Sequence, residues 1–358
     1  MKKKKTLSII TSLTIVVLLL AGCGSTGATP NASSSGSTPK TTFKDGMVTD
    51  IGGVNDQSFN QGAWTGLQKF GQENPGVQVK YLESTQSSDY SSNLNQFSSN
   101  NYNLVWAIGY LMADAVTASA KAYPKVNFAI IDDSITPTPD NLSCVLFRAQ
   151  ESSFEVGYMA ALKTKTDKVG FIGGVTGTVI DEFEYGFRAG VAYGAKELGK
   201  NIAVNVQYAN SFSDASLGKA IAQNMYAQGA DIIFAAAGNV GQGMITEAKA
   251  ENKLCEGVDM DQSGLAPNNV LTSAMKNVND VVGLISKDVL DGKKVGGKTI
   301  SYGLKEGGVG IPYTDQAIKM AGQDVITKVK AVQQEIIDGK IIPPSNKATY
   351  TTYLDSLK

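Results

Sequence analysis

The chain has 358 residues, of which 32 are basic and 33 are acidic, and it contains no histidine. The absence of histidine excludes the usual Ser-His and Cys-His catalytic arrangements and removes a principal ligand of zinc. Only two of the basic residues are arginines, Arg148 and Arg188, and no cluster of basic residues dominates. This composition argues against nucleic-acid binding, which relies on clustered Lys and Arg side chains to neutralise phosphates.

The first 23 residues have the pattern of an export signal. Four lysines follow Met1, an apolar run extends from about Leu7 to Leu20, and small residues lead to Cys23. A positive segment, a short apolar segment and small residues before a cleavage point are typical of a secretory signal peptide. The apolar run is short for a transmembrane helix, which needs about 20 residues. The alternatives are a plain N-terminal anchor helix and a signal peptide cut at another position.

The tetrapeptide that ends at Cys23, Leu-Ala-Gly-Cys, resembles the bacterial lipobox. In that motif the cysteine receives a diacylglycerol and becomes the mature N-terminus, so the resemblance implies that residues 1–22 are removed. The predicted location is the extracytoplasmic face of the cell membrane, where two acyl chains anchor more durably than one. We expect residues 23–42 to form a lipid-anchored flexible linker, because 24–42 are rich in Ser, Gly, Thr and Pro and carry one charge.

Removal of residues 1–22 takes four lysines away and leaves 336 residues, enough for two domains of ordinary size. From Gly46 onward, short apolar runs alternate with amphipathic helical stretches. Strands are predicted at 46–50, 78–82, 104–108, 127–131, 169–172, 203–208, 232–235 and 254–259. Helices are predicted between them at 58–73, 91–100, 112–123, 154–162, 183–198, 215–228 and 241–251. This alternation predicts parallel sheets covered by helices on both faces.

The predicted strands divide evenly around Glu151, four before it and four after it. A single (β/α)8 barrel fits the same count, but residues 143–151 read as a strand followed by polar residues suited to cross between lobes. The pattern also continues through helices at 279–291 and 315–339, with a strand-like segment at 299–304. We therefore predict two doubly wound α/β lobes with parallel sheets. The predicted N-terminal lobe comprises 43–150 and 266–298, and the predicted C-terminal lobe comprises 151–265 and 299–358.

The loops that follow the strands of open α/β sheets face the cleft in which such proteins bind ligands. After the first strand come Asp50, a glycine-rich turn, and Asp56, which is placed to cap the next helix. Phe59 falls in the first turn of that helix, where its ring either faces the cleft or packs in the core. After the fourth strand, Asp132 and Asp133 should point to opposite faces, so that at most one of them faces the cleft.

The loops of the second half carry a similar set of side chains. Phe183 lies near the start of a helix, and Phe212 follows the sixth strand. The run GNVGQG at 238–243 differs from the dinucleotide fingerprint GxGxxG, but glycines at a helix N-terminus let a ligand approach backbone N–H groups. Asp261 follows the eighth strand and is suited to accept two hydrogen bonds from a vicinal diol. Lys276 is either close to the same ligand or a solvated surface lysine.

Several of these segments together resemble the basic membrane protein family, the substrate-binding lipoproteins of ABC importers also called purine nucleoside receptor A-like. The segments are DIGGVNDQSFN (50–60), SFSD (211–214), AAGNVGQG (236–243), GVDMDQ (257–262) and LTSAMK (271–276). The resemblance covers nearly all of residues 44–345, in order. It implies a type I periplasmic-binding-protein fold with a hinge, a purine nucleoside ligand, and an ABC permease and ATPase as partners; we expect a monomer.

The resemblance also implies a role for each candidate residue. The base would be held between aromatic rings, and the ribose hydroxyls by a carboxylate and a lysine. The aromatic candidates are Phe59 together with either Phe212 or Phe183. The candidates for the polar edges of the ligand are Asp50 and Asp133, with Asn60 as a further ligand-binding residue. The candidates for the ribose are Gly238, Asp261 and Lys276.

The expected function is therefore capture of guanosine, inosine or adenosine and delivery to the permease, without catalysis, cofactor or metal. A sugar, riboflavin or a signalling molecule is an alternative ligand for the same scaffold. A nucleoside hydrolase that uses Asp50, Asp56 or Asp133 is a rival of another class, although no nucleophile–base pair in the sequence supports it. A surface adhesin or immunogen without transport is a third possibility. Cys144 and Cys255 either form one disulfide or remain buried thiols.

Overall fold

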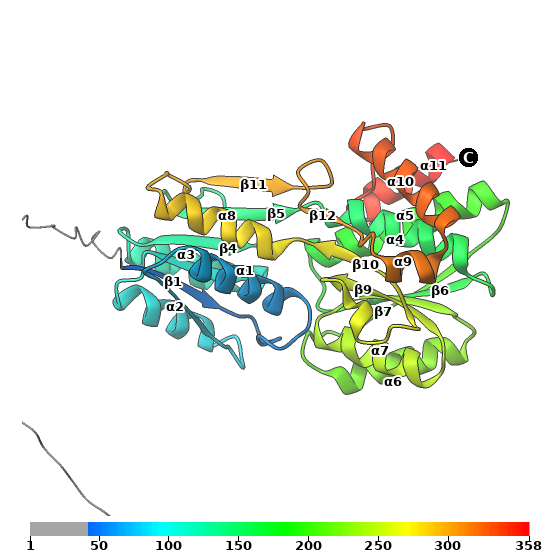
Figure 1. Cartoon of the computed structure of the whole chain (residues 1–358), viewed down its shortest axis with the longest axis horizontal. Helices are drawn as coiled ribbons and strands as arrows, with labels where there is room; N and C mark the ends of the chain where they lie inside the picture. The colour runs from blue at the N-terminus through cyan, green and yellow to red at the C-terminus, as the bar shows by residue number, and fades with distance from the viewer. Residues whose placement is uncertain (1–41, 358) are drawn as a thin grey trace, which may run out of the picture. The chain divides into compact units, whose positions relative to one another are not determined.

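Two six-stranded sheets organise the chain, and helices cover each of them (Figure 1). The computed structural model describes residues 42–357, so the predicted signal peptide, Cys23 and all but the last residue of the predicted linker lie outside the described residues. The strands hydrogen-bond within two separate sheets, which confirms the prediction of two α/β lobes and excludes a single barrel.

The first lobe is built on a sheet with the order β11-β5-β4-β3-β1-β2, and all of its strand pairs are parallel. The strands are β1 (Phe43–Val48), β2 (Val77–Leu82), β3 (Leu104–Ile108), β4 (Asn127–Ile131), β5 (Leu142–Phe147) and β11 (Lys298–Tyr302). The helices are α1 (Phe59–Glu73), α2 (Asp89–Ser99), the short η1 (Tyr110–Met112), α3 (Ala113–Ala122) and α8 (Val278–Leu290). Every residue of β3 is buried, as expected for a strand in the interior of a parallel sheet.

The second lobe has the strand order β12-β10-β9-β8-β6-β7, and only the short β12 pairs antiparallel. The strands are β6 (Lys168–Gly173), β7 (Ala203–Tyr208), β8 (Ile232–Ala236), β9 (Leu254–Asp259), β10 (Val270–Lys276) and β12 (Val309–Gly310). The helices are α4 (Ala149–Lys163), α5 (Thr178–Leu198), α6 (Ala215–Ala227), α7 (Asn239–Ala250), the short η2 (Gln262–Gly264), α9 (Asp315–Ala321), α10 (Gln323–Ile337) and α11 (Lys347–Leu357). Helices α4 and α5 cover one side of this sheet, and α6 and α7 cover the other (Figure 1).

Helix α1 shows how the sequence pattern positions the cleft residues. Its buried positions include Ala63, Gly66, Leu67 and Phe70, which follow the 3.6-residue period of an amphipathic helix. A side chain at Gly66 would bring its Cβ within 2.1 Å of the backbone oxygen of Asn279 in α8. The two helices therefore pack in direct backbone contact, which fixes the first turn of α1 relative to the sheet.

The chain crosses between the lobes three times, and two of the predicted lobe boundaries are wrong. Strand β10 pairs with β9, so the chain returns to the first lobe only after Lys276, whereas 266–298 as a whole was assigned to that lobe. Strand β11 pairs with β5 in the first sheet, whereas 299–358 as a whole was assigned to the second lobe. The order of elements along the chain does not reveal these boundaries, because the strand pairs that set them join residues far apart in sequence.

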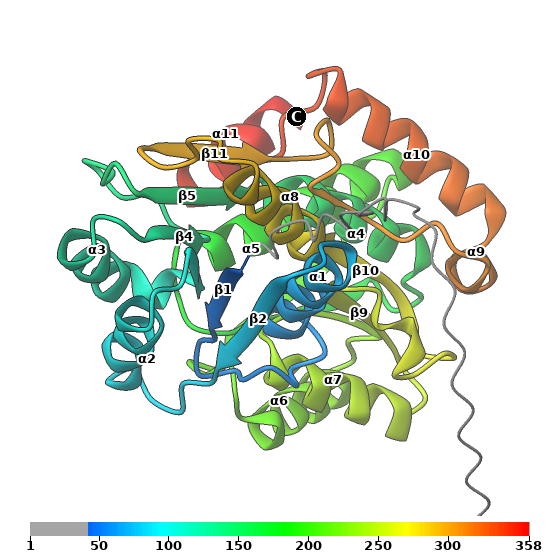
Figure 2. The same ribbon diagram turned by 60° about the vertical axis from the view of Figure 1, so that its left-hand side comes forward.

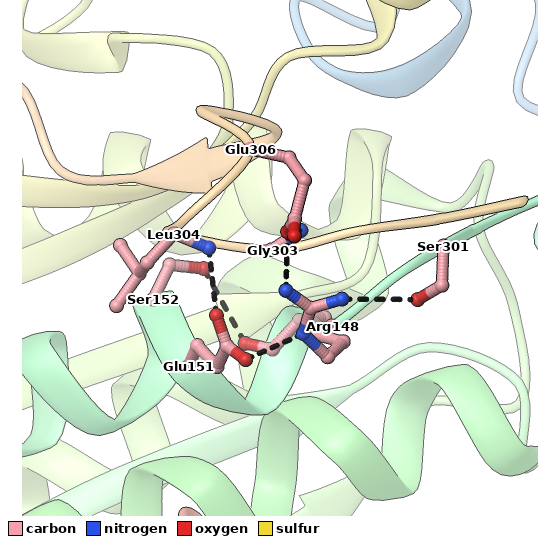
Figure 3. A network of polar contacts seen from close by, with 8 residues as sticks. Arg148, Glu151, Ser152, Ser301, Gly303, Leu304 and Glu306 are labelled. Carbon is pink, nitrogen blue, oxygen red and sulfur yellow. Dashed lines mark hydrogen bonds and ion pairs between the residues drawn. The ribbon is translucent and has the colours of Figure 1, made fainter. Parts of the chain in front are cut away.

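Two of the crossing segments are tied together by Arg148, at the junction of β5 and α4 (Figure 3). Its guanidinium forms ion pairs with Glu151 at 2.6 Å and with Glu306. Its backbone N–H donates to the Tyr302 oxygen at 2.8 Å. Glu151 in turn accepts from the Leu304 N–H at 2.6 Å, so the start of α4 and the segment after β11 are held as one body.

Some predicted helices differ from the observed ones at their ends. The predicted helix at 315–339 is two helices, α9 and α10, separated at Gly322, whose φ of +94° suits glycine and ends the first helix. Helix α5 begins at Thr178 instead of 183, and α4 begins at Ala149 instead of 154. Polar residues in the first turn of α4 mask its start in the sequence.

Cys144 and Cys255 are both free and buried, in different sheets. They are therefore two buried thiols, which decides between the two alternatives considered for them. Within residues 42–357, no helix is long and apolar enough to cross a membrane.

Candidate ligand site

A pocket lies between the lobes, where the carboxyl ends of both sheets meet. Its empty volume, including the part open to solvent, is about 540 Å³. This volume lies within the usual range for small-molecule sites. The first lobe contributes Asp50, Gly52, Asp56, Phe59, Asn60, Gly109, Tyr110, Leu111 and Asp132. The second lobe contributes Val179, Ile180, Phe183, Phe212, Ala236, Ala237, Gly238, Val258, Asp259 and Lys276. Seven of the predicted ligand-binding residues are therefore brought together: Asp50, Phe59, Asn60, Phe183, Phe212, Gly238 and Lys276.

Asp50 is held in place by Asn60 from the first turn of α1. The Asn60 amide donates to Asp50 Oδ1 at 2.8 Å and to Asp56 Oδ2 at 2.9 Å. Asp56 also accepts the backbone N–H groups of Ser58, Asn60 and Gln61, so it satisfies the first turn of α1 as expected, although the N-cap position itself is Ser58. Both amide hydrogens of Asn60 are therefore engaged, and its polar groups serve to position Asp50. The second carboxylate oxygen of Asp50 lies beside Gly109, and both residues line the pocket.

Three side chains form a charged cluster, defined here as Asp132, Asp259 and Lys276. The Lys276 ammonium forms a direct ion pair with Asp132 and lies 3.9 Å from Asp259. The lysine is only 4% exposed, so the interpretation of Lys276 as a solvated surface residue is wrong. Asp259 also accepts a hydrogen bond from the Ser58 hydroxyl at 2.5 Å, across the cleft. The cluster therefore joins the two lobes directly inside the pocket.

The pocket uses Asp132 and Asp259 where the sequence predicted Asp133 and Asp261. Asp133 accepts a hydrogen bond from the Ser134 N–H, and Asp261 accepts one from the Ser263 N–H at the start of η2; neither lines the pocket. The expectation that at most one of the Asp132–Asp133 pair faces the cleft is confirmed, and the one that lines the pocket is Asp132, whereas the sequence favours Asp133. Asp132 and Asp259 have φ of +72° and +63°, which non-glycine residues seldom adopt. Such backbone conformations concentrate at functional sites.

Burial raises the pKa of several acids around the cluster. The pKa of Asp50 is raised to about 6 by burial, although bonds from Asn60 and Gly52 oppose the change. Burial also raises the pKa of Asp259 to about 6 against the opposing charge of Lys276. Burial raises the pKa of Glu182, next to Phe183, to about 8. Burial lowers the pKa of Lys276, but the negative charges of Asp132 and Asp259 raise it by more. The pKa of Lys276 therefore lies above its usual value. Within residues 42–357, no group of three or more Cys, Asp or Glu side chains is placed to hold a metal ion.

Aromatic rings line the pocket from both lobes. Phe59, from the first lobe, has its ring centre 4.3 Å from the Lys276 ammonium, and Phe183, from the second, has its ring 5.8 Å from the same nitrogen. Phe183 is 2% exposed and packs on Phe234, so it also belongs to the core of the second lobe. Phe212 is less buried than Phe183. The geometry leaves both of these rings available as the partner of Phe59.

Tyr110, which the sequence analysis missed, forms an aromatic pair with Phe212 across the cleft. The two ring centres lie 6.4 Å apart in an edge-on arrangement. The Tyr110 hydroxyl donates to the Val175 oxygen of the second lobe at 3.1 Å. The preceding Gly109, with a φ of +117°, ends β3 and turns the chain at the pocket wall. A glycine directly after a fully apolar strand was the sequence signal for this position.

The geometry is that of a ligand site closed between two lobes, and comparison with known proteins agrees with it. Residues 43–347 match the family described as ABC transporter substrate-binding protein PnrA-like. The chain belongs to this family. Members of the family are substrate-binding proteins of ABC transporters, which confirms the family resemblance seen in the sequence.

Relatives in the PnrA-like family match over almost their whole length. The ABC transporter nucleoside-binding protein BmpA of Lactococcus lactis subsp. cremoris is 40% identical, and the match covers 96% of this chain and 99% of that protein. Basic membrane protein A of Borreliella burgdorferi is 37% identical, with 98% of both chains covered. A solved ABC transporter solute-binding protein from Aeropyrum pernix K1 superimposes with a TM-score of 0.79 at 27% identity, over 88% of this chain and 97% of that one. This solved structure confirms the periplasmic-binding-protein fold.

Proposed function

We propose that the protein captures a purine nucleoside, such as guanosine, inosine or adenosine, between its lobes and delivers it to an ABC permease. The observation that carries this proposal is the combination of Phe59 with the charged cluster in one pocket. An aromatic ring can stack on any nucleobase, and each such contact contributes about 1–3 kcal/mol to binding. A carboxylate and an ammonium side by side are suited to accept and donate hydrogen bonds at ribose hydroxyls.

The charges of the pocket support a neutral nucleoside over a nucleotide. Asp50, Asp132 and Asp259 line the pocket with Lys276 as the one cationic lining residue, and neither arginine lines it. A phosphate would meet an excess of carboxylates and no guanidinium fork, which is the preferred partner of phosphate oxygens. A relative that is described as nucleoside-binding supports the same ligand class.

The proposal extends to where the protein acts. We infer that Cys23 carries the diacylglycerol anchor and that the protein works as a monomer on the extracytoplasmic face of the cell membrane. A tether of Ser, Gly and Thr between Cys23 and β1 would keep the binding lobes close to the permease. Growth with labelled palmitate tests the anchor: label should enter the wild type and be lost in Cys23→Ala, and label retained in that variant would refute it.

Calorimetry with residues 43–358, which contain both lobes, tests the ligand class. Guanosine, inosine or adenosine should bind with a Kd in the micromolar range or tighter, and the corresponding monophosphates should bind poorly. Sugars, riboflavin and free bases complete the panel. Binding of a sugar or riboflavin without any nucleoside would refute the purine assignment. Recovery of free base after incubation would show that the protein is a hydrolase instead.

A further inference from the structure

Three side-chain amides of the second lobe donate to backbone carbonyls of one loop of the first lobe. Asn239 donates to the Gly52 oxygen at 2.8 Å, Gln242 to the Asn55 oxygen at 3.4 Å and Gln262 to the Gln57 oxygen at 2.9 Å. The accepting loop joins β1 to α1 and runs beside α7 (Figure 2). We call Asn239, Gln242 and Gln262 the amide clasp.

The amides of the clasp are oriented by further hydrogen bonds within the second lobe. The Gln242 amide also donates to Asn239 Oδ1 at 2.6 Å, and Gln262 Oε1 accepts from the Val258 N–H at 3.0 Å. The amide oxygens of Asn239 and Gln262 are therefore occupied by donors. As a result, the N–H groups of these two residues face the loop of the first lobe. This preorganisation distinguishes the clasp from incidental surface contacts.

None of the three clasp residues lines the pocket. Their bonds join the lobes whatever ligand lies between them, and they require the two lobes to be in contact. Tyr110 and Ser58 also bond across the cleft, but Tyr110 lines the pocket, and Ser58 bonds to the Asp259 carboxylate, which belongs to the charged cluster. The clasp bonds end on backbone oxygens, and of the three acceptors only Gly52 lines the pocket. The clasp side chains therefore lie outside the pocket and bond to no side chain that lines it.

We propose that the amide clasp sets how tightly the protein holds any ligand, while the pocket sets which ligand it holds. A protein that binds its ligand between lobes has an apparent affinity that scales with the population of its binding-competent closed form. Bonds that exist only in the closed form raise that population equally for every ligand. Asn239, Gln242 and Gln262 are therefore positioning residues. The inference rests on the proposed function for its affinity readout.

The clasp also gives the run GNVGQG at 238–243 a second role. From sequence this run predicted a glycine loop that brings backbone N–H groups to a ligand, and Gly238 does line the pocket. The two polar side chains of the run, Asn239 and Gln242, turn instead to the opposite lobe. One short segment therefore serves the pocket through its glycine and lobe closure through its amides.

The decisive variant is Asn239→Asp, which keeps the size of the side chain but presents an acceptor to the Gly52 carbonyl. Asn239 is the first residue of α7, where a carboxylate is favourable for the helix, so the fold should be preserved. The matched control is Asn205→Asp in β7 of the same lobe, whose amide donates to Gln228 Oε1 within that lobe. Gln242→Ala, which removes the longest of the three bonds without a charge, should give a smaller effect in the same direction.

Two measurements test the inference. Calorimetry with guanosine, inosine and adenosine should show Kd values at least fivefold weaker in Asn239→Asp, with the ratios between ligands unchanged within twofold. Resonance energy transfer between dyes on the two lobes should show a more open ligand-free protein than in the wild type or Asn205→Asp. An effect on one nucleoside only, or unchanged affinity and opening, would overturn the clasp. If the wild type binds no nucleoside, the proposed function fails, while the energy-transfer result still decides the clasp.

Discussion

Two parts of the pocket, the charged cluster and the aromatic pair of Tyr110 and Phe212, differ in their burial and in the contacts that hold them. In the charged cluster, Lys276 pairs with Asp132, and both side chains are at most 6% exposed. In the aromatic pair, Tyr110 and Phe212 are partly exposed and touch edge-on, with one hydrogen bond from Tyr110 to the second lobe. Buried charges must keep their partners, whereas aromatic contacts tolerate small displacements. We infer that the charged cluster fixes ligand orientation and that the rings supply contact area.

The largest expected loss of nucleoside affinity comes from a substitution in the charged cluster. Lys276→Met should weaken nucleoside binding at least 100-fold, because it removes the ammonium proposed to donate to the ribose hydroxyls, and loss of one partner of a buried charge pair at a binding interface costs about 2–5 kcal/mol. It would leave Asp132 and Asp259 close together without their shared counter-charge. Calorimetry measures the affinity, and circular dichroism confirms the fold. The control is Lys293→Met, which removes an exposed lysine paired with Asp288 and should change nothing. An affinity within threefold of the wild type would show that the cluster plays no part in binding.

A matched pair of substitutions tests which neighbouring carboxylate belongs to the cluster. Asp132→Asn should weaken binding about tenfold or more, since a hydrogen bond to a charged group contributes about 1.5–3 kcal/mol. Asp133→Asn, one residue further on, should leave the affinity within twofold. Calorimetry on both variants with the same nucleoside makes the comparison. The reverse order would restore the sequence-based choice of Asp133.

Asp132 and Asp133 also show which features of the site can be predicted from the sequence and which cannot. Side-chain alternation correctly predicts that only one of the pair faces the cleft. The choice depends on the left-handed backbone of Asp132, which is set by the turn after β4 and has no signature in the residue types. Asp259 also has a left-handed backbone and lines the pocket, whereas Asp261 has neither property. The predicted residues that lie in the pocket, such as Phe59 and Phe212, follow strand ends or begin helices, where the elements themselves fix the position.

Most of the fold follows from local patterns, and the parts that do not are long-range. The observed bounds of β3, β4, β7 and β9 are those predicted. The lobe boundaries fail because β10 and β11 are assigned by pairing with distant strands. The clasp could not be predicted, since amide side chains at Asn239 and Gln262 carry no sign of the carbonyls they meet in the other lobe.

On the aromatic side, Phe59→Ala should weaken nucleoside binding about tenfold, within the range of a lost base–ring stack of about 1–3 kcal/mol. Phe59→Tyr keeps the ring and should stay within threefold. Parallel measurements on Phe183→Ala and Phe212→Ala decide which ring faces Phe59 across the base. Phe183→Ala should also lower the thermal stability, because Phe183 packs on Phe234 in the core. Unchanged affinity in Phe59→Ala would place that ring in the core alone.

The smallest expected effect is the change of ligand affinity with pH. The direction of this change distinguishes titration of the pocket carboxylates from acid unfolding of the whole protein. Asp50 and Asp259 have pKa values raised from 3.8 to about 6, so both lose their charge as the pH falls through that value. If a ligand needs the ionised form of one such carboxylate, its Kd should weaken about fourfold between pH 7.5 and pH 5.5.

The stability of the ligand-free protein should follow the opposite trend. Because these two pKa values are raised on folding, the protonated carboxyls favour the folded state, and their contribution to the free energy of unfolding falls as the pH rises from about 4 to about 6. Affinity that weakens at pH 5.5 while the melting temperature holds or rises would therefore locate the titration in the pocket. Affinity that is flat with pH would mean that the ligand does not depend on these charges, and the role of the charged cluster would then rest on Lys276 and Asp132.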